Sequence, residues 1–391
     1  MNMDRLVAGH VKDVPPSGIR KFFDIASEIK DAISLSVGEP DFVTPWNITE
    51  SAIYALEHGR THYTSNSGLI ELRELICQYY QTRFDVSYQP DQVLVTVGAS
   101  EAIDLAVRAL VEPGDEVLIP APTYVSYAPT VALAHGVPVG IPTGEDTAFK
   151  LDPDTVKGMI GPKTKAIIVP YPNNPTGAVM DREDLLALSR VLADTNVVVI
   201  SDEIYAELTY GGNHVSIASI PSMYERTIVL NGFSKAFAMT GWRLGYAAGH
   251  PSLIAAMLKI HQFTMLCASI MSQYAGVEAL RQGFETNFLS VAKMREEYDR
   301  RRHYIVSELN RIGLSCHNPG GAFYAFPNIA ASGQDSEAFC EGLLFSKKVA
   351  VVPGTAFGDA GEGHVRISYA ASMANIKTAM VRMEEYLAEC E

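Results

Sequence analysis

The sequence predicts an α/β protein whose main domain is a mostly parallel sheet covered by helices on both faces. Two observations support this prediction. Short, continuously apolar and β-branched segments such as Val197-Val198-Val199-Ile200 recur through the middle of the chain, and helical stretches separate them. Continuous apolar strands are typical of parallel sheets buried on both faces, whereas strands with one solvated face alternate apolar and polar residues.

Seven such segments, taken in chain order, predict a seven-stranded sheet. They are residues 92–97, 116–120, 137–141, 165–169, 197–201, 227–230 and 244–249. Helical periodicity between them predicts helices at 101–110, 126–135 and 181–193. The last of these begins with several acidic residues, which suits the positive end of the helix dipole.

The C-terminal part has a different pattern and predicts a second, smaller α+β domain. A charge-rich helix at 284–311, short strands at 323–326 and 349–352, and an amphipathic helix at 374–391 are expected there. The Pro-rich segment 15–18 is expected to return to this layer. We therefore expect a large domain at 46–284 and a small domain formed by 1–45 with 285–391.

The composition is that of an ordinary globular protein with a large core: 391 residues, of which 47% are hydrophobic and 19% charged. The formal charge of -14 argues against nucleic acid or an anionic membrane as the main partner. The N-terminus lacks the order of a signal peptide, and no apolar run is long enough to span a bilayer. Five scattered cysteines without a C-x-x-C pair predict a reducing cytoplasm and no metal site.

Lys235 is the candidate nucleophile. It lies among small and apolar neighbours in Ser234-Lys235-Ala236-Phe237, a few residues before Arg243. Apolar surroundings disfavour the ammonium form, and the neutral amine can attack a carbonyl to make a Schiff base. For a lone lysine, a surface side chain lying over apolar neighbours is the simpler explanation. The assignment therefore depends on the other motifs.

Polar residues that follow the predicted strands are the next candidates, because ligands of open α/β sheets bind beyond the carboxyl ends of the strands. Gly98-Ala99-Ser100 opens a helix and could bind an anion, although a plain helix cap explains it about as well. Asp202 follows the 197–201 strand and could pair with a protonated ring nitrogen or act as an N-cap. Asn174 lies in a Pro-Gly turn that could direct its amide into a pocket.

Two arginines are candidate anion-binding residues. Arg243 can hold a phosphate in a fork of N–H donors. Arg366 lies in a predicted strand of the small domain, where a buried arginine needs an anionic partner, either a ligand or a structural carboxylate. By residue type alone, Tyr63, Tyr124 and Tyr205 fit a core or interface at least as well as a cofactor site.

As an ordered set, these motifs resemble those of the class I and II aminotransferases, fold-type I enzymes that use pyridoxal phosphate. The resemblance covers essentially the whole chain. Its segments are Ser36-Val37-Gly38-Glu39-Pro40-Asp41-Phe42, Tyr63-Thr64, Gly98-Ala99-Ser100, Asn174-Pro175-Thr176-Gly177, Ser201-Asp202-Glu203-Ile204-Tyr205, Ser234-Lys235 through Arg243, and Val365-Arg366-Ile367-Ser368. The opening Ser17-Gly18-Ile19-Arg20-Lys21-Phe22 is similar to the bacterial subgroup that includes N-acetyl-diaminopimelate aminotransferases.

The resemblance implies a role for each motif around the cofactor ring. Lys235 would bind the cofactor as a Schiff base and later move the proton between the substrate Cα and the cofactor C4′. Asp202 would pair with the ring nitrogen and keep the ring a good electron sink. Asn174 and Tyr205 would bind the 3′-oxygen, and Tyr124 would stack on the ring.

It also implies how the phosphate and the substrate are held. The phosphate cradle would consist of Gly98, Ala99, Ser100, Ser234 and Arg243. Tyr63 would reach the phosphate of the neighbouring subunit, so that the active unit is a homodimer. Arg366, helped by the Gly38 backbone and Asn174, would clamp the substrate α-carboxylate and so select the Cα bond that breaks.

The implied activity is ping-pong transfer of an amino group from an L-amino acid to a 2-oxo acid such as 2-oxoglutarate, as in amino-acid biosynthesis. N-acetyl-LL-diaminopimelate, an aromatic amino acid and aspartate remain alternative donors. No second arginine for an acidic side chain is identified, and Arg20 and Lys21 are candidates by position only. Two other functions stay open: a C–S β-lyase or related enzyme with the same cofactor, and a non-catalytic ligand sensor, which would need an added basic DNA-binding domain.

Overall fold

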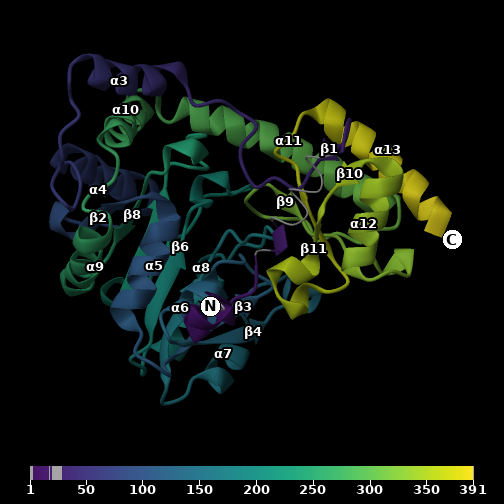
Figure 1. Cartoon of the computed structure of the whole chain (residues 1–391), viewed down its shortest axis with the longest axis horizontal. Helices are drawn as coiled ribbons and strands as arrows, with labels where there is room; N and C mark the ends of the chain where they lie inside the picture. Colours follow the sequence, from purple (N-terminus) through teal and green to yellow (C-terminus); the bar gives the residue numbers. More distant parts are fainter. Residues whose placement is uncertain (1–2, 17, 20–28, 391) are drawn as a thin grey trace.

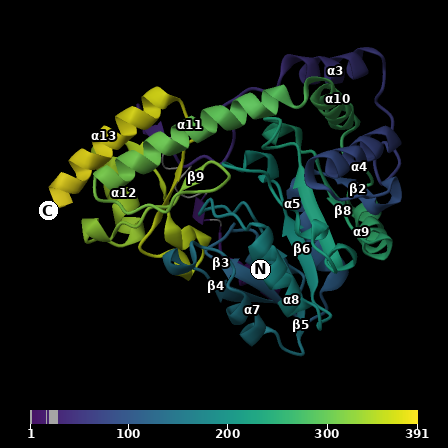
Figure 2. The same ribbon diagram turned by 180° about the vertical axis from the view of Figure 1, so that it is seen from behind.

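The computed structural model describes residues 3–16, 18–19 and 29–390. Figures 1 and 2 show two parts: a larger one built around a twisted sheet, and a smaller one that contains the C-terminus. The long helix α11 (Leu289–Arg311) runs from one part to the other. The predicted domain limits at residues 46 and 284 remain a prediction.

The larger part contains a seven-stranded sheet in the order β2-β8-β7-β6-β5-β3-β4. The strands are β2 Val93–Thr96, β3 Glu116–Ala121, β4 Val137–Pro142, β5 Thr164–Val169, β6 Val198–Asp202, β7 Thr227–Gly232 and β8 Gly245–Ala248. Strands β4, β3, β5, β6 and β7 pair in parallel, and β8 is antiparallel to both of its neighbours. The predicted mostly parallel, seven-stranded sheet is confirmed.

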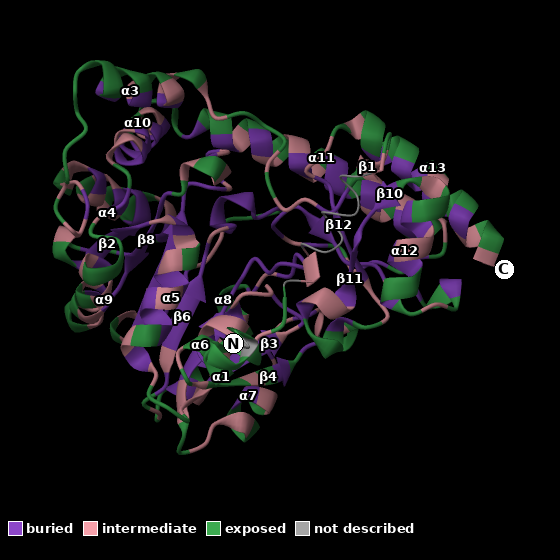
Figure 3. Ribbon diagram, viewed as in Figure 1, coloured by how far each residue is buried: buried purple, intermediate pink, exposed green. Residues whose placement is uncertain are grey.

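Helices cover both faces of this sheet, as expected for continuously apolar strands. The helices of the larger part are α4 Ile70–Phe84, α5 Gly98–Leu110, α6 Tyr127–Leu133, α7 Pro153–Met159, α8 Arg182–Leu192, α9 Pro251–Thr264, α10 Ile270–Thr286 and α3 Trp46–Glu57, of which α3 packs on α10. Ile200 of β6 belongs to the core beneath α5 and α9, whereas Val199 belongs to the core beneath α8. Figure 3 shows the buried sheet and the exposed outer sides of the helices.

The smaller part brings the two ends of the chain together. Strand β1 (Ile33–Ser34) pairs in parallel with β10 (Val349–Ala350). Strands β11 (Val352–Pro353), β12 (Val365–Ser368) and β9 (Tyr324–Ala325) form an antiparallel sheet, and α12 (Ser336–Lys347) and α13 (Met373–Cys390) cover it. The single strand expected at 349–352 is thus two short strands that pair with different partners.

The single helix expected at 284–311 is wrong at its start. Helix α10 ends at Thr286 and α11 begins at Leu289, because Asn287 and Phe288 adopt left-handed φ values of 51° and 55°. The Phe288 ring packs directly against Gly283, where no Cβ stands in its way. In the part of the chain that the structure describes, no helix is both long and apolar enough to cross a membrane.

Candidate active site

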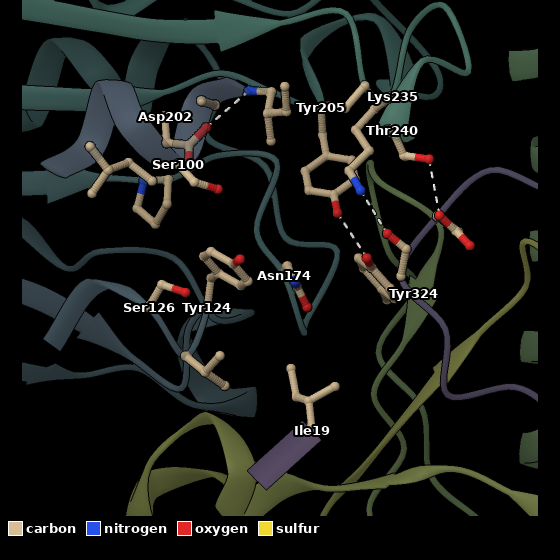
Figure 4. A pocket seen from close by; sticks show the side chains of 18 of the residues that line it. Ile19, Ser100, Tyr124, Ser126, Asn174, Asp202, Tyr205, Lys235, Thr240 and Tyr324 are labelled. Atoms are coloured by element: carbon tan, nitrogen blue, oxygen red, sulfur yellow. Dashed lines mark hydrogen bonds between the residues drawn. The ribbon is translucent and has the colours of Figure 1, made fainter. Parts of the chain in front are cut away.

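A pocket of about 530 Å³ opens at the carboxyl ends of the parallel strands, where the two parts of the molecule meet. Most of the predicted site residues line it: Gly38, Ala99, Ser100, Tyr124, Asn174, Asp202, Tyr205, Ser234, Lys235, Arg243 and Arg366. Figure 4 shows the side chains of Asp202, Asn174, Tyr205 and Lys235 around this one cavity. Residues from distant parts of the sequence are therefore brought together.

Lys235 follows strand β7 and extends its amine into the pocket. Its Nζ donates a hydrogen bond of 2.6 Å to the carbonyl of Gly38. Burial lowers the pKa of Lys235 to about 8; the charge of Glu39 opposes this change, and those of Arg366 and Arg243 add to it. A substantial fraction of this amine is therefore neutral, and so nucleophilic, near neutral pH.

Asp202 is the last residue of β6 and lies inside the pocket wall. Its Oδ2 accepts a hydrogen bond of 2.8 Å from the Tyr127 hydroxyl, and its Oδ1 accepts one of 3.1 Å from the Ile204 N–H. Burial raises the pKa of Asp202 to about 6, and the bond from Tyr127 limits that rise. The carboxylate is thus available to a cationic N–H group inside the pocket.

Arg366 lies on β12 and is only 1% exposed. Its Nη1 donates to the Asn174 Oδ1 at 3.0 Å and its Nη2 to the Ser36 carbonyl at 2.5 Å, while its Nε has no partner. Its guanidinium lies over the Tyr324 ring, 4.5 Å from the centroid. No carboxylate among the described residues pairs with it, so its buried charge remains available to an anionic ligand.

The N-terminus of α5 and the Arg243 side chain lie together beside the pocket. Gly98 has a φ of +74°, and a Cβ at this position would lie 2.6 Å from the Arg243 Nη2. The first N–H groups of α5 have no intrahelical acceptors, and Ser100 and Ser234 add hydroxyls beside them. Gly98 does not line the pocket itself; it allows Arg243 to approach the helix end.

Of the predicted site residues, Gly98 and Tyr63 do not line the pocket, and Tyr63 also lies away from the groups that do. Its side chain is 83% exposed in the single chain. Arg20 and Lys21 lie outside the described residues. No cluster of three or more His, Cys, Asp or Glu side chains suited to a metal occurs among the residues described.

Two tyrosines of the site were missed by the sequence analysis. Tyr324 bonds the Tyr205 hydroxyl at 2.8 Å and supports the Arg366 guanidinium. Tyr127 holds Asp202. Tyr127 lies three residues after Tyr124 at the start of α6, but no local sequence pattern distinguishes either Tyr127 or Tyr324 as a site residue.

These residues fit pyridoxal phosphate on observations of the site itself. The α5 terminus and Arg243 suit a phosphate, the Asp202 carboxylate suits a pyridinium N–H, and the Lys235 amine suits an aldehyde carbon. The orphaned Nε and unpaired charge of Arg366 suit a carboxylate on the substrate.

Comparison with known sequences agrees with this chemistry. The family model "Aminotransferase class I and II" matches residues 30–383. The chain is 52% identical to "Putative aminotransferase YugH" of Bacillus subtilis, over 98% of this chain and 99% of that protein. It is 48% identical to an aspartate aminotransferase of Pyrococcus abyssi (96% and 97%) and 39% identical to a "Probable N-acetyl-LL-diaminopimelate aminotransferase" of B. subtilis (98% and 96%).

Solved structures show the same fold. An aromatic aminotransferase from Pyrococcus horikoshii superposes with a TM-score of 0.89 at 44% identity, over 95% of this chain and 99% of that one. The aspartate aminotransferase of Thermus thermophilus with maleate gives a TM-score of 0.93 at 38% identity, over 97% and 99%.

Proposed function

This chain belongs to the class I and II aminotransferases, which depend on pyridoxal phosphate, and from that premise we propose how its residues carry out the transfer. The enzyme moves an amino group from an L-amino acid to a 2-oxo acid, and we propose 2-oxoglutarate as the acceptor. The observation that carries the residue roles is one pocket in which a lysine with a lowered pKa, a buried carboxylate and an unpaired buried arginine converge.

Bound in this pocket, pyridoxal phosphate supplies an aldehyde for the amine and a ring that withdraws electrons from the substrate Cα. Arg366 binds the substrate α-carboxylate and orients the Cα–H bond. Lys235, as a neutral amine, would take that proton from the substrate Cα and deliver it to the cofactor C4′. Asp202 would keep a proton on the ring nitrogen, and Asn174 and Tyr205 would donate hydrogen bonds to the ring oxygen.

The phosphate is held by Ala99, Ser100, Ser234 and Arg243, with Gly98 allowing the close approach. Stacking on Tyr124 completes the site. Tyr63 belongs to this site through a homodimer, in which it reaches the phosphate of the other subunit. Support for the dimer comes from the 83% exposure of Tyr63 in the single chain, which leaves this residue accessible to a second subunit.

The physiological donor is N-acetyl-LL-diaminopimelate, an aromatic amino acid or aspartate, since relatives named for each of these are similar over almost the whole chain. We place the enzyme in the cytoplasm and in amino-acid biosynthesis. The five cysteines are all free within the described residues, which suits a reducing compartment.

A donor panel tests this proposal directly. The purified holoenzyme is incubated with 2-oxoglutarate and each candidate donor, and glutamate and the absorbance of the bound cofactor are followed. One donor class should produce glutamate with a far higher kcat/KM than the others. Lys235→Ala should retain cofactor and lose turnover. Release of pyruvate and ammonia from cystathionine without glutamate would instead identify a β-lyase.

A further inference from the structure

Glu203 is a buried carboxylate directly behind the pocket. It follows Asp202 in the chain and is 0% exposed, but it does not line the cavity. Successive residues of an extended segment face opposite sides, so Glu203 points away from the ligand while Asp202 points toward it. Its Oε1 accepts hydrogen bonds from the hydroxyls of Ser201 at 3.0 Å and Ser216 at 2.6 Å.

Glu203 has no arginine or lysine partner among the described residues. Among the described residues, only the imidazole of His214 lies within ion-pair distance, with its Nε2 at 3.4 Å and no aligned hydrogen bond. Glu207, on the same segment, is also buried but is bound by Arg83 through Nε at 2.9 Å and Nη2 at 2.8 Å. Of two neighbouring buried carboxylates, one is therefore paired with an arginine and the other lies only beside an imidazole.

A chain of hydrogen bonds links Glu203 to the strand that leads to Lys235. The Tyr80 hydroxyl donates to the Glu203 Oε2 at 3.3 Å and accepts from the Asn231 Nδ2 at 2.9 Å. Asn231 in turn accepts from the N–H of Gly232, the last residue of β7, at 2.7 Å. The ends of β6 and β7 are thus connected on the side opposite the pocket.

Burying a carboxylate without an arginine or lysine partner is costly. A Gln side chain has nearly the same shape, and its oxygen could accept from Ser201 and Ser216, but its NH2 group could not accept from Tyr80. The Glu203 carboxylate raises the pKa values of ionisable groups around it. It contributes, after burial, to the raised pKa of Asp202 and to the raised pKa values of Tyr80, Tyr88 and Tyr246.

We propose that Glu203 is a positioning residue of this enzyme, whose buried carboxylate acts on the reaction through Asp202 and through the strand end that carries Lys235. It touches neither substrate nor cofactor. The inference rests on the proposed roles of Asp202 and Lys235. The Glu203 carboxylate favours the protonated forms of the groups at the Asp202 end of the pocket. The Tyr80–Asn231 hydrogen bonds fix the distance between the Asp202 carboxylate and the Lys235 amine.

The test is Glu203→Gln in the holoenzyme, with a pH titration of the absorbance of the bound cofactor as the main readout. Removing the charge should lower the titration midpoint by roughly half a pH unit to one unit, the order expected for a nearby buried charge. The kcat should fall about tenfold with KM nearly unchanged, because an interaction used in the chemical step is lost.

Glu207→Gln is the matched control, since it makes the same change at a buried carboxylate that Arg83 neutralises. It should lower the Tm and leave the midpoint in place. A wild-type midpoint in Glu203→Gln, or an equal shift in both variants, would overturn the proposal and leave Glu203 a structural residue.

Tyr80→Phe provides a second test in case Glu203→Gln does not fold. It breaks the connection to Asn231 and leaves every charge in place, so kcat should fall while the midpoint stays. A wild-type kcat in Tyr80→Phe would also overturn the proposal. If the wild-type protein itself shows no cofactor absorbance that titrates, the proposed roles of Asp202 and Lys235 fail instead.

Discussion

The amine of Lys235 is predicted to be far more reactive than an ordinary lysine in the protein freed of cofactor. Burial lowers its pKa from 10.5 to about 8. At pH 7 about one molecule in ten then carries the neutral amine, compared with about one in three thousand for a free lysine, a difference of roughly 300-fold. The amine is protonated and unreactive below the pKa, so its reactivity should rise through pH 8 and then level off.

Competitive reductive methylation measures this difference. Limiting formaldehyde with cyanoborohydride is applied to the cofactor-free protein at a series of pH values, and the labelled peptides are quantified by mass spectrometry. Lys150 serves as the internal reference. Its burial lowers the pKa, but the hydrogen bond and charge of Asp184 outweigh this and leave the pKa above 10.5.

The variant Glu39→Gln tests whether the labelling midpoint follows the charges around Lys235, because Glu39 is the strongest of the charges that raise the pKa of Lys235. Removing this charge should move the Lys235 midpoint to lower pH and leave the Lys150 profile unchanged. If the labelling of Lys235 instead follows that of Lys150 up to the ordinary lysine range, the claim that burial activates this amine is refuted.

Three further outcomes follow from the pocket. Arg366→Lys keeps the positive charge but loses the pair of N–H groups that can bind a carboxylate together. Loss of two charge-assisted hydrogen bonds to the substrate, about 1.5 kcal/mol each, predicts a fall in kcat/KM of roughly 100-fold with an unchanged cofactor spectrum. Gly98→Ala should raise the Kd for pyridoxal phosphate about tenfold or more, because the new Cβ would lie 2.6 Å from the Arg243 Nη2. Gly211→Ala, with a φ of +71° but open space around it, is the control and should leave that Kd unchanged. Tyr63→Phe should weaken cofactor binding by about tenfold in fluorescence titration, the cost of one hydrogen bond to a charged group, while the sedimentation of the proposed homodimer stays the same.

The central sheet could be predicted from the sequence because its strands are buried on both faces. A strand such as β6 has no face exposed to solvent, so its apolar run Val198–Ile200 differs clearly from the amphipathic helices around it. The motifs that follow β5, β6 and β7 were then expected at one edge by topology alone, and Asn174, Asp202 and Lys235 do line one pocket. Local patterns together with the rules of parallel sheets are sufficient for this much.

What the sequence did not reveal depends on contacts between distant segments. The break between α10 and α11 arises where Phe288 packs on Gly283, and charge periodicity carries no sign of it. Tyr324 reaches Tyr205 only because β9 lies beside the larger part. The hydrogen-bond partners of the Glu203 carboxylate are Tyr80 of α4, Ser201 of β6 and Ser216. They lie too far apart in the chain for any local sequence pattern to contain them.

The charges of the pocket imply that its ligands change the basicity of Lys235. Arg243 and Arg366 both lower the pKa of this amine, after burial. A phosphate held by Arg243 and a carboxylate held by Arg366 would each neutralise one of these charges, so the amine becomes a stronger base once both anions are bound. The empty pocket therefore favours the neutral amine that captures an aldehyde, whereas the filled pocket favours an amine that takes a proton from the substrate Cα. Inorganic phosphate added to the cofactor-free protein should raise the midpoint of Lys235 labelling at constant ionic strength, and an unchanged midpoint would remove Arg243 from the phosphate site.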